Sequence, residues 1–479
     1  MVGLTWEFHN QCQQRFHAEG HLKMLFRLAL SLLGGALETL RAQSSQEAID
    51  ALLSEAGSLN WLCTCVAVVN QTLGWDFSDA STCGAVVGLA SLAPSTARAD
   101  VITPGKAWSD VLVVQATLDL LYGIYSVCRF SRNEALSHAC RQSLVHISAI
   151  KGDVFADQAA RSAFLDHSLL SVLALVPSVR EHEYVDLALI LLRLMSNFQA
   201  KAHILKRNLE SLLLSLILIG VLYSKYTWAL TCENFGKAVM SVPRAQAHLE
   251  ALGGLTCTLM TLSSSSSEPS LREALDSLLE VWSSMAVDLQ MREEEPAMLQ
   301  ALAPYTAKIF RAYIEKSLRD AVRDVEEWDA AEEEHEDKSV GEERLVSVGC
   351  TGRAMLGDAL SLLSQLIHER TEALRAVLIE GRRLSAKEAG VALEQLLSLV
   401  SISARCIADE AEGETPMIPD AVAKVSAESG ARGVDDPVVV LTNQVVETIK
   451  VFVVRASLLL LVGASLLPAV CIFSRRLEL

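Results

Sequence analysis

Apolar residues recur at intervals of three and four in one segment after another along the 479-residue chain. The clearest run comprises Leu271, Leu275, Leu278, Leu279, Trp282, Met285 and Leu289. Two further runs comprise Leu112, Ala116, Leu120, Gly123 and Val127, and Leu356, Leu360, Leu363 and Ile367. This spacing places apolar side chains on one face of an α-helix. The chain is therefore predicted to fold as a series of helices that each bury one face.

The composition favours the same conclusion, because the chain is 51% hydrophobic but only 5% aromatic. Leu, Ala, Ser and Val dominate, and strands prefer β-branched and aromatic residues. Turn-forming residues divide the chain into segments of roughly 15–25 residues. These predicted breaks lie at residues 103–105, 151–153, 177–178, 253–254, 263–270 and Pro304. A succession of helix pairs follows from this spacing.

A chain of this length exceeds a single hydrophobic core, which stops growing at about 250–300 residues. No strict tetratricopeptide pattern is present, which leaves the degenerate HEAT and armadillo class. We therefore predict an all-α fold, a HEAT/armadillo-like solenoid of stacked antiparallel helix pairs. The expected parts are a solenoid over 1–323, an acidic loop at 324–343, a continuation over 344–408, a polar Gly/Pro loop at 409–436, and a terminal helix with an apolar tail at 437–479.

The charge is strongly acidic, with 58 Asp and Glu against 41 Lys and Arg and a net charge of −17. This balance disfavours nucleic acid and favours basic partners. Segment 324–343 carries almost one sign of charge and cannot bury a face. It is either a solvated segment or a surface that contacts a basic partner. The candidate contact residues are Glu326, Glu327, Asp329, Glu332, Glu333, Glu334, Glu336 and Asp337.

Catalytic chemistry is not indicated, since the chain has no phosphate loop, nucleophile elbow, HExxH helix or dinucleotide fingerprint. We predict no enzyme activity, no catalytic residues, no cofactor and no metal site. Cys63 and Cys65 lack a second ligand pair, and His17 and His21 lack a neighbouring carboxylate or thiol. The eleven scattered cysteines are expected to be free, mostly buried thiols.

Two apolar stretches invite a test as membrane spans. Residues 212–223 are shorter than the ~20 residues that a span requires. Residues 456–473 hold eighteen positions without a charge, between Arg455 and Arg475. That stretch is a tail-type span, a buried terminal helix or a gene-model artefact, with the membrane interpretation the less favoured.

Several segments resemble, in the same order, the middle portion of the exportin-4 family of nuclear transport receptors, within the importin-β superfamily. They are GLTWEFHNQC at 3–12, NQTLGWDF at 70–77, Trp108 with its following helix, residues 144–155, residues 273–282, IFRAYI at 309–314, SVG at 347–349, ER at 369–370 and GETPMIP at 413–419. The similarity spans about residues 3–440 and fades beyond them.

The resemblance implies a HEAT superhelix that binds protein cargo together with the GTP-bound GTPase Ran. Such a receptor shuttles between nucleus and cytoplasm through the nuclear pore, where it contacts nucleoporins. The implied cargo is like translation initiation factor 5A, a basic factor that suits an acidic groove. The resemblance also implies that family regions before residue 1 and after residue 440 are missing. A membrane-tail-anchored solenoid adaptor or a general scaffold is the alternative.

Overall fold

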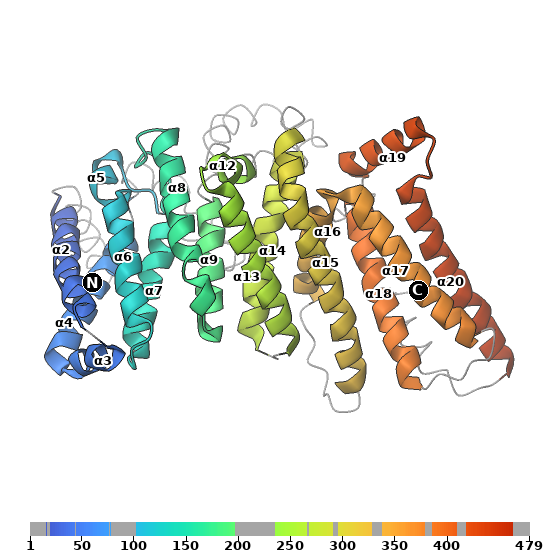
Figure 1. The fold of residues 1–479 in the computed structure, drawn as a ribbon, viewed down its shortest axis with the longest axis horizontal. Helices are drawn as coiled ribbons and strands as arrows, with labels where there is room; N and C mark the ends of the chain where they lie inside the picture. The colour runs from blue at the N-terminus through green and yellow to red at the C-terminus, as the bar shows by residue number, and fades with distance from the viewer. Residues whose placement is uncertain are drawn as a thin grey trace, which may run out of the picture. The chain divides into compact units, whose positions relative to one another are not determined.

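The computed structural model describes residues 16, 20–43, 45–75, 77, 102–196, 235–265, 268–290, 296–327, 338–378, 386–409 and 418–462. The chain forms two compact units, Met1–Leu252 and Gly253–Leu479. Across the described ranges the regular elements are helices, and an isolated β-bridge joins Ile102 to Ile150. The ribbon in Figure 1 shows these helices, and the all-α prediction is confirmed.

The first unit stacks helix pairs in two layers. Helices α2, α6, α8 and α12 pack in succession in one layer, and α4, α7 and α9 do so in the other. The pairs α2 with α4, α6 with α7, and α8 with α9 join the layers. The elements are α2 (His21–Arg41), α3 (Gln46–Ser54), α4 (Ala56–Leu73), η1 (Lys106–Trp108), α5 (Ser109–Leu112), α6 (Gln115–Cys128), α7 (Glu134–Ser148), α8 (Gln158–Leu173), η2 (Val176–Ser178), η3 (Glu181–Glu183), α9 (Tyr184–Ser196) and α12 (Phe235–Ser241).

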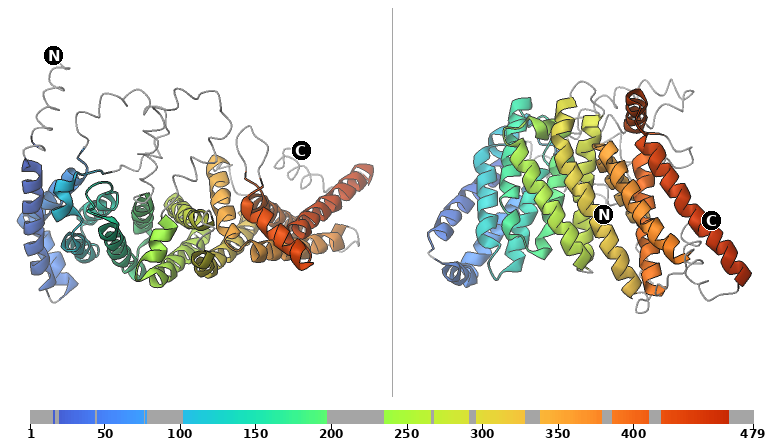
Figure 2. Two further views of the ribbon diagram at one scale, coloured as in Figure 1. Left: turned by 90° about the horizontal axis from the view of Figure 1, so that it is seen from above. Right: turned by 45° about the vertical axis from the view of Figure 1, so that its right-hand side comes forward.

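The second unit repeats this kind of packing. Helices α14, α16 and α18 pack in succession, α15 packs against all three, and α17 packs against α16, α18, α19 and α20. Two further views show the same side-by-side helices within each unit (Figure 2). The elements are α13 (Ala245–Ser265), which begins in the first unit, α14 (Pro269–Gln290), α15 (Pro296–Glu327), α16 (Lys338–Arg353), α17 (Leu356–Leu378), α18 (Ala386–Ile407), α19 (Asp420–Arg432) and α20 (Pro437–Val462).

Short polar side chains begin several helices in the first unit. The side chains of Ser45, Asn133 and Asp157 accept hydrogen bonds from the backbone N–H groups of Ala48, Leu136 and Ala160. Each bond satisfies a donor that the first helical turn leaves unpaired. Asn133 starts α7 directly after the turn that follows α6.

The predicted helix faces are confirmed most clearly in α14 and α17. All seven apolar residues of the 271–289 run are buried, as are the four of the 356–367 run. Trp282 also donates its indole N–H to the Thr256 hydroxyl at 2.9 Å. In α6 the helix is confirmed but its face is shifted, because Leu118, Leu121 and Tyr125 are buried while Ala116 is exposed.

Two predicted breaks are wrong. Pro304 lies inside the continuous helix α15, and Gly253 and Gly254 lie inside α13. A proline in a helix interior costs about 3 kcal/mol, which packing can outweigh. Around Pro304 that packing comes from the buried residues Leu302 and Ile309. Residues 263–265, predicted as linker, likewise continue α13.

The two predicted loops are shorter in the structure. Within 409–436, residues 420–432 form helix α19, which buries Val422 and ends at Gly433. Gly433 adopts the left-handed conformation, with φ of 66°, that commonly terminates a helix. At 324–343, α15 continues to Glu327 and α16 starts at Lys338. These helical residues were predicted as loop because polar composition is typical of exposed helix ends as well as of loops.

By length and composition alone, two described segments are long and apolar enough to cross a membrane, residues Gln158–Ser178 and Gly390–Ile407. Two bent helix pairs also pass this test if each counts as one span. Within their units, α8 packs against α6, α9 and α12, and α18 packs against α15, α16 and α17. Of the two apolar stretches noted in the sequence, residues 212–223 lie outside the described residues. The second stretch is partly described: α20 includes residues 456–462, and residues 463–473 lie outside the described residues.

Candidate partner-binding site

In the part of the chain that the structure describes, no group of three or more His, Cys, Asp or Glu residues could hold a metal ion. The residues considered in the sequence as metal ligands therefore have no further ligands beside them there. His17 lies outside the described residues, and His21 contacts the Phe16 ring at a centroid distance of 5.6 Å. The seven described cysteines are free and five are buried, as predicted for them. Burial raises the pKa of the Cys63 and Cys65 thiols, which disfavours the reactive thiolate.

The acidic candidate segment is only partly within the described residues. Glu326 lies in the last turn of α15, where its carboxylate is 3.0 Å from the Lys387 ammonium on α18. Glu327 ends the same helix. The other six candidates, Asp329, Glu332, Glu333, Glu334, Glu336 and Asp337, lie outside the described residues. The structure thus shows where the acidic segment leaves α15 but does not bring its carboxylates together.

The charges around this end of α15 are distributed unevenly between interior and surface. Buried Lys316 is ion-paired with Asp320, and Arg323 donates to the Ser264 carbonyl. By contrast, the side chains of Asp324 and Glu326 are 62% and 51% exposed. On α16, Glu342 and Glu343 are exposed as well. Exposed carboxylates therefore occur at this end of α15 together with at least one exposed cation, Lys387, whose side chain is 58% exposed.

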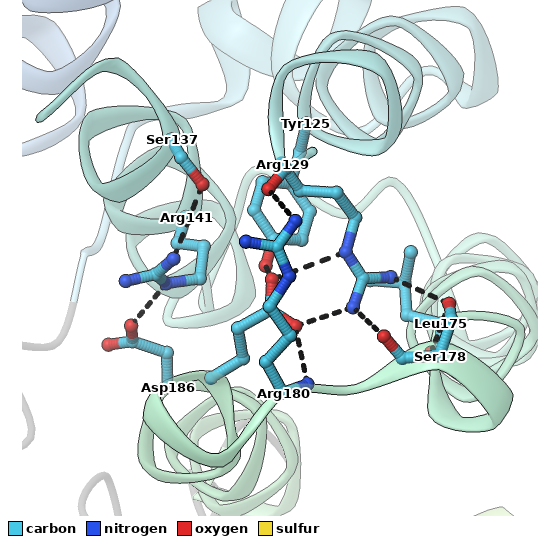
Figure 3. Close-up of polar contacts among 9 residues, drawn as sticks. Tyr125, Arg129, Ser137, Arg141, Leu175, Ser178, Arg180 and Asp186 are labelled. Carbon is cyan, nitrogen blue, oxygen red and sulfur yellow. Dashed lines mark hydrogen bonds and ion pairs between the residues drawn. The ribbon is translucent and has the colours of Figure 1, made fainter. Parts of the chain in front are cut away.

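A second polar site, in the first unit, was not predicted. Arg129 directly follows α6, and its guanidinium forms a two-pronged ion pair with Glu183 of η3, with nitrogen–oxygen distances of 3.2 and 2.5 Å. Tyr125 donates its hydroxyl to the same carboxylate at 2.6 Å. The Arg129 side chain is 2% exposed and that of Glu183 is fully buried. Figure 3 shows Arg129 reaching from α6 across to the segment that carries Ser178 and Arg180.

Backbone groups form hydrogen bonds with both members of this ion pair. Arg129 donates to the Ser178 carbonyl at 2.8 Å, and the backbone N–H of Arg180 donates to Glu183 at 2.9 Å. Burial alone would raise the pKa of Glu183, but the hydrogen bonds from Arg129, Tyr125 and the Arg180 backbone lower it below its ordinary value. Glu183 is therefore ionised, and its charge neutralises Arg129. Removing either partner would leave a buried unpaired charge.

A parallel ion pair joins the next two helices. Arg141 of α7 donates to Asp186 of α9 at 2.6 Å, and it also contacts Ser137 and His138 on its own helix. Together the two ion pairs tie α6, α7 and α9 around the turn at residues 129–133. Beside them lies a cleft of about 240 Å³ whose lining includes Arg129, Arg141 and Arg180. This arrangement offers hydrogen-bond donors to a bound group; it contains no nucleophile paired with a base.

Sequence reasoning missed these residues for a physical reason. Glu183 is 54 positions from Arg129, and Asp186 is 45 positions from Arg141. Only the stacking of α6, α7 and α9 brings them together. In the sequence, Arg129 is visible only as a charged residue at the end of an apolar helical run. A charged residue in that position is usually exposed to solvent.

The amino-acid sequence matches a known protein family. The family model for exportin-4 matches residues 1–451 of this chain. The chain belongs to the exportin-4 family. The family places it among nuclear transport receptors, which are not an enzyme class, and it confirms the resemblance seen in the sequence.

Among solved structures, the chain matches the crystal structure of an engineered protein at 12% identity, over 86% of this chain and 98% of that one. The TM-score of 0.17 is too low for this match to inform the fold or the function. The exportin-4 family membership therefore carries the functional assignment.

Proposed function

We propose that this chain acts as a nuclear export receptor that binds protein cargo together with GTP-bound Ran and moves with it from the nucleus to the cytoplasm through nucleoporin contacts. The observation that carries the proposal is the family match over residues 1–451. The stacked helix pairs support it, because helical repeats expose long surfaces suited to holding proteins.

The cargo that we propose is a basic protein like translation initiation factor 5A. The net charge of −17 supports this choice, as do the exposed carboxylates of Asp324, Glu326, Glu342 and Glu343. Complementary charge accelerates encounter and discriminates against acidic partners. We further propose that segment 324–343 contacts the basic partner directly.

A pull-down on immobilised translation initiation factor 5A tests the receptor proposal. The chain should be retained when Ran–GTP is added, and less of it should be retained with Ran–GDP. Retention that ignores the nucleotide, or no retention, would contradict the receptor proposal.

The role of the acidic segment needs its own variant. Replacing its eight candidate carboxylates by Gln and Asn should reduce retention and weaken its dependence on salt. A control variant neutralises an equal number of exposed acids in the first unit, among them Glu38, Glu47 and Glu55. Equal retention of both variants in the presence of Ran–GTP would discard the acidic contact and leave the receptor proposal standing.

A further inference from the structure

The cleft beside the turn that joins α6 to α7 has a lining rich in positive charge and hydrogen-bond donors. Three arginines and two histidines line it, against one carboxylate. They are Arg129, Arg141, Arg180, His138, His182 and Glu134. Its volume of about 240 Å³ is below the ~300 Å³ at which pockets for whole small molecules begin. The cleft is therefore of a size for a single head group.

The three arginines differ in how their charge is compensated. Glu183 neutralises Arg129, and Asp186 neutralises Arg141. The Arg180 guanidinium donates to the Arg129 carbonyl at 2.7 Å and lies 5.1 Å from the centroid of the Phe130 ring. Among the described residues, no carboxylate lies within ion-pair distance of it. One half-buried cation at the cleft thus lacks a counter-charge.

The hydrogen-bond pattern leaves further donors available. The Arg141 guanidinium lies 3.4 Å from Nδ1 of His138. A guanidinium can only donate, so Nδ1 must accept, and the neutral ring carries its proton on Nε2. The Ser131 hydroxyl, also in the lining, is buried and has no hydrogen-bond partner among the described residues. The opposing carboxylate, Glu134, is exposed in the first turn of α7.

We propose that this cleft binds an oxyanion presented by a partner protein, either a carboxylate or a phosphate group. Arg180 supplies the uncompensated charge, and Nε2–H of His138 supplies a second donor. Phe130, whose ring contacts the Arg180 guanidinium, is 44% exposed and offers an apolar contact to the residue next to the oxyanion. A nucleic-acid backbone is disfavoured as the source because the chain carries a net charge of −17. The inference does not depend on the proposed function.

The test uses the full chain and measures binding of inorganic phosphate by ³¹P NMR and of ¹³C-labelled acetate by ¹³C NMR. Arg180→Gln removes the free charge, and Arg180→Lys retains it. The matched control is Arg132→Gln, since Arg132 is 92% exposed and lines a neighbouring cleft instead. Circular dichroism establishes that each variant remains helical, and His138→Gln, at an exposed position, serves if Arg180→Gln fails to fold.

We expect millimolar binding of at least one anion, weakened about tenfold by Arg180→Gln and changed less than about twofold by Arg132→Gln. Arg180→Lys should bind with intermediate affinity, and His138→Gln should weaken binding about threefold. Phosphate alone would indicate a phosphorylated partner, acetate alone a carboxylate, and both would support the shared oxyanion chemistry. No binding of either anion, or equal effects of Arg180→Gln and Arg132→Gln, would overturn the proposal.

Discussion

Each unit of the molecule ties helices together with a buried arginine, but the two arginines are satisfied differently. In the first unit, Arg129 pairs with the fully buried carboxylate of Glu183. In the second, Arg353 of α16 donates to the carbonyls of Arg405, Cys406 and Ala408 at the end of α18, at 2.6, 3.0 and 3.1 Å. Its carboxylate partner, Asp409, is 49% exposed.

The comparison shows two ways in which the charge of a buried arginine can be compensated. Carbonyls at a helix C-terminus lack partners and carry partial negative charge, so a cation there is stabilised without a buried carboxylate. The Arg129 pair instead depends on a second ionisable group. The first unit should therefore be sensitive to the loss of one side chain and to acid, and the second unit should be less so.

The largest effect is expected from Glu183→Gln, which leaves Arg129 buried without a counter-charge. Breaking a buried ion pair in this way costs about 3–5 kcal/mol. Because the chain has two units, hydrogen exchange by mass spectrometry is the suitable measurement, with peptides from α6, α7 and α9 losing protection. The control is Glu181→Gln, two positions earlier and exposed. Equal protection in both variants would refute the importance of the pair.

A somewhat smaller effect is expected from Gly349→Ala, because this glycine lets α16 approach α18 closely. A Cβ at this position would lie 2.5 Å from the Arg405 carbonyl oxygen. Overpacking of this kind costs about 1–3 kcal/mol. Gly357→Ala on α17 is the control, because its Cβ would meet nothing within 4 Å. Hydrogen exchange of α16 and α18 peptides should separate the two variants; equal protection would show that the close approach is unimportant.

Arg353→Met should cost less than Glu183→Gln, about 1–3 kcal/mol for lost hydrogen bonds from a charged group. The three carbonyls that it frees lie at a helix end, where water can replace part of the loss. Exchange of α16 and α18 peptides measures the effect. A loss of protection as large as that from Glu183→Gln would remove the distinction between the two arginines.

The smallest effect is a difference in acid sensitivity. The pKa of Glu183 is lowered in the folded state, so its stabilisation is present above the ordinary glutamate pKa, near 4.3, and is lost as pH falls below it. Peptides of α6 and α9 should therefore lose protection in acid before those of α16 and α18. In Glu183→Gln this added acid sensitivity should vanish, whereas its persistence would assign it to other carboxyls.

The sequence predicted much of the fold and little of the site. Period and composition located the buried face of α14, including Trp282, because helical spacing is a local property. The continuity of α13 through Gly253 and of α15 through Pro304 could not be predicted, since packing overrides local propensity there. The Arg129–Glu183 pair depends on contacts between distant helices. The contact role of the acidic segment remains a prediction; of its eight candidate carboxylates, Glu326 has a described ion pair, and six lie outside the described residues.

The central claim is that this chain holds cargo as an export receptor, and the cargo affinity with and without Ran–GTP tests it most directly. The proposal requires that the two partners favour each other's binding, and coupling between two binding sites typically changes affinity about 5–150-fold. We predict that saturating Ran–GTP lowers the Kd of translation initiation factor 5A by at least about fivefold. An unchanged or increased Kd in the presence of Ran–GTP would contradict the account.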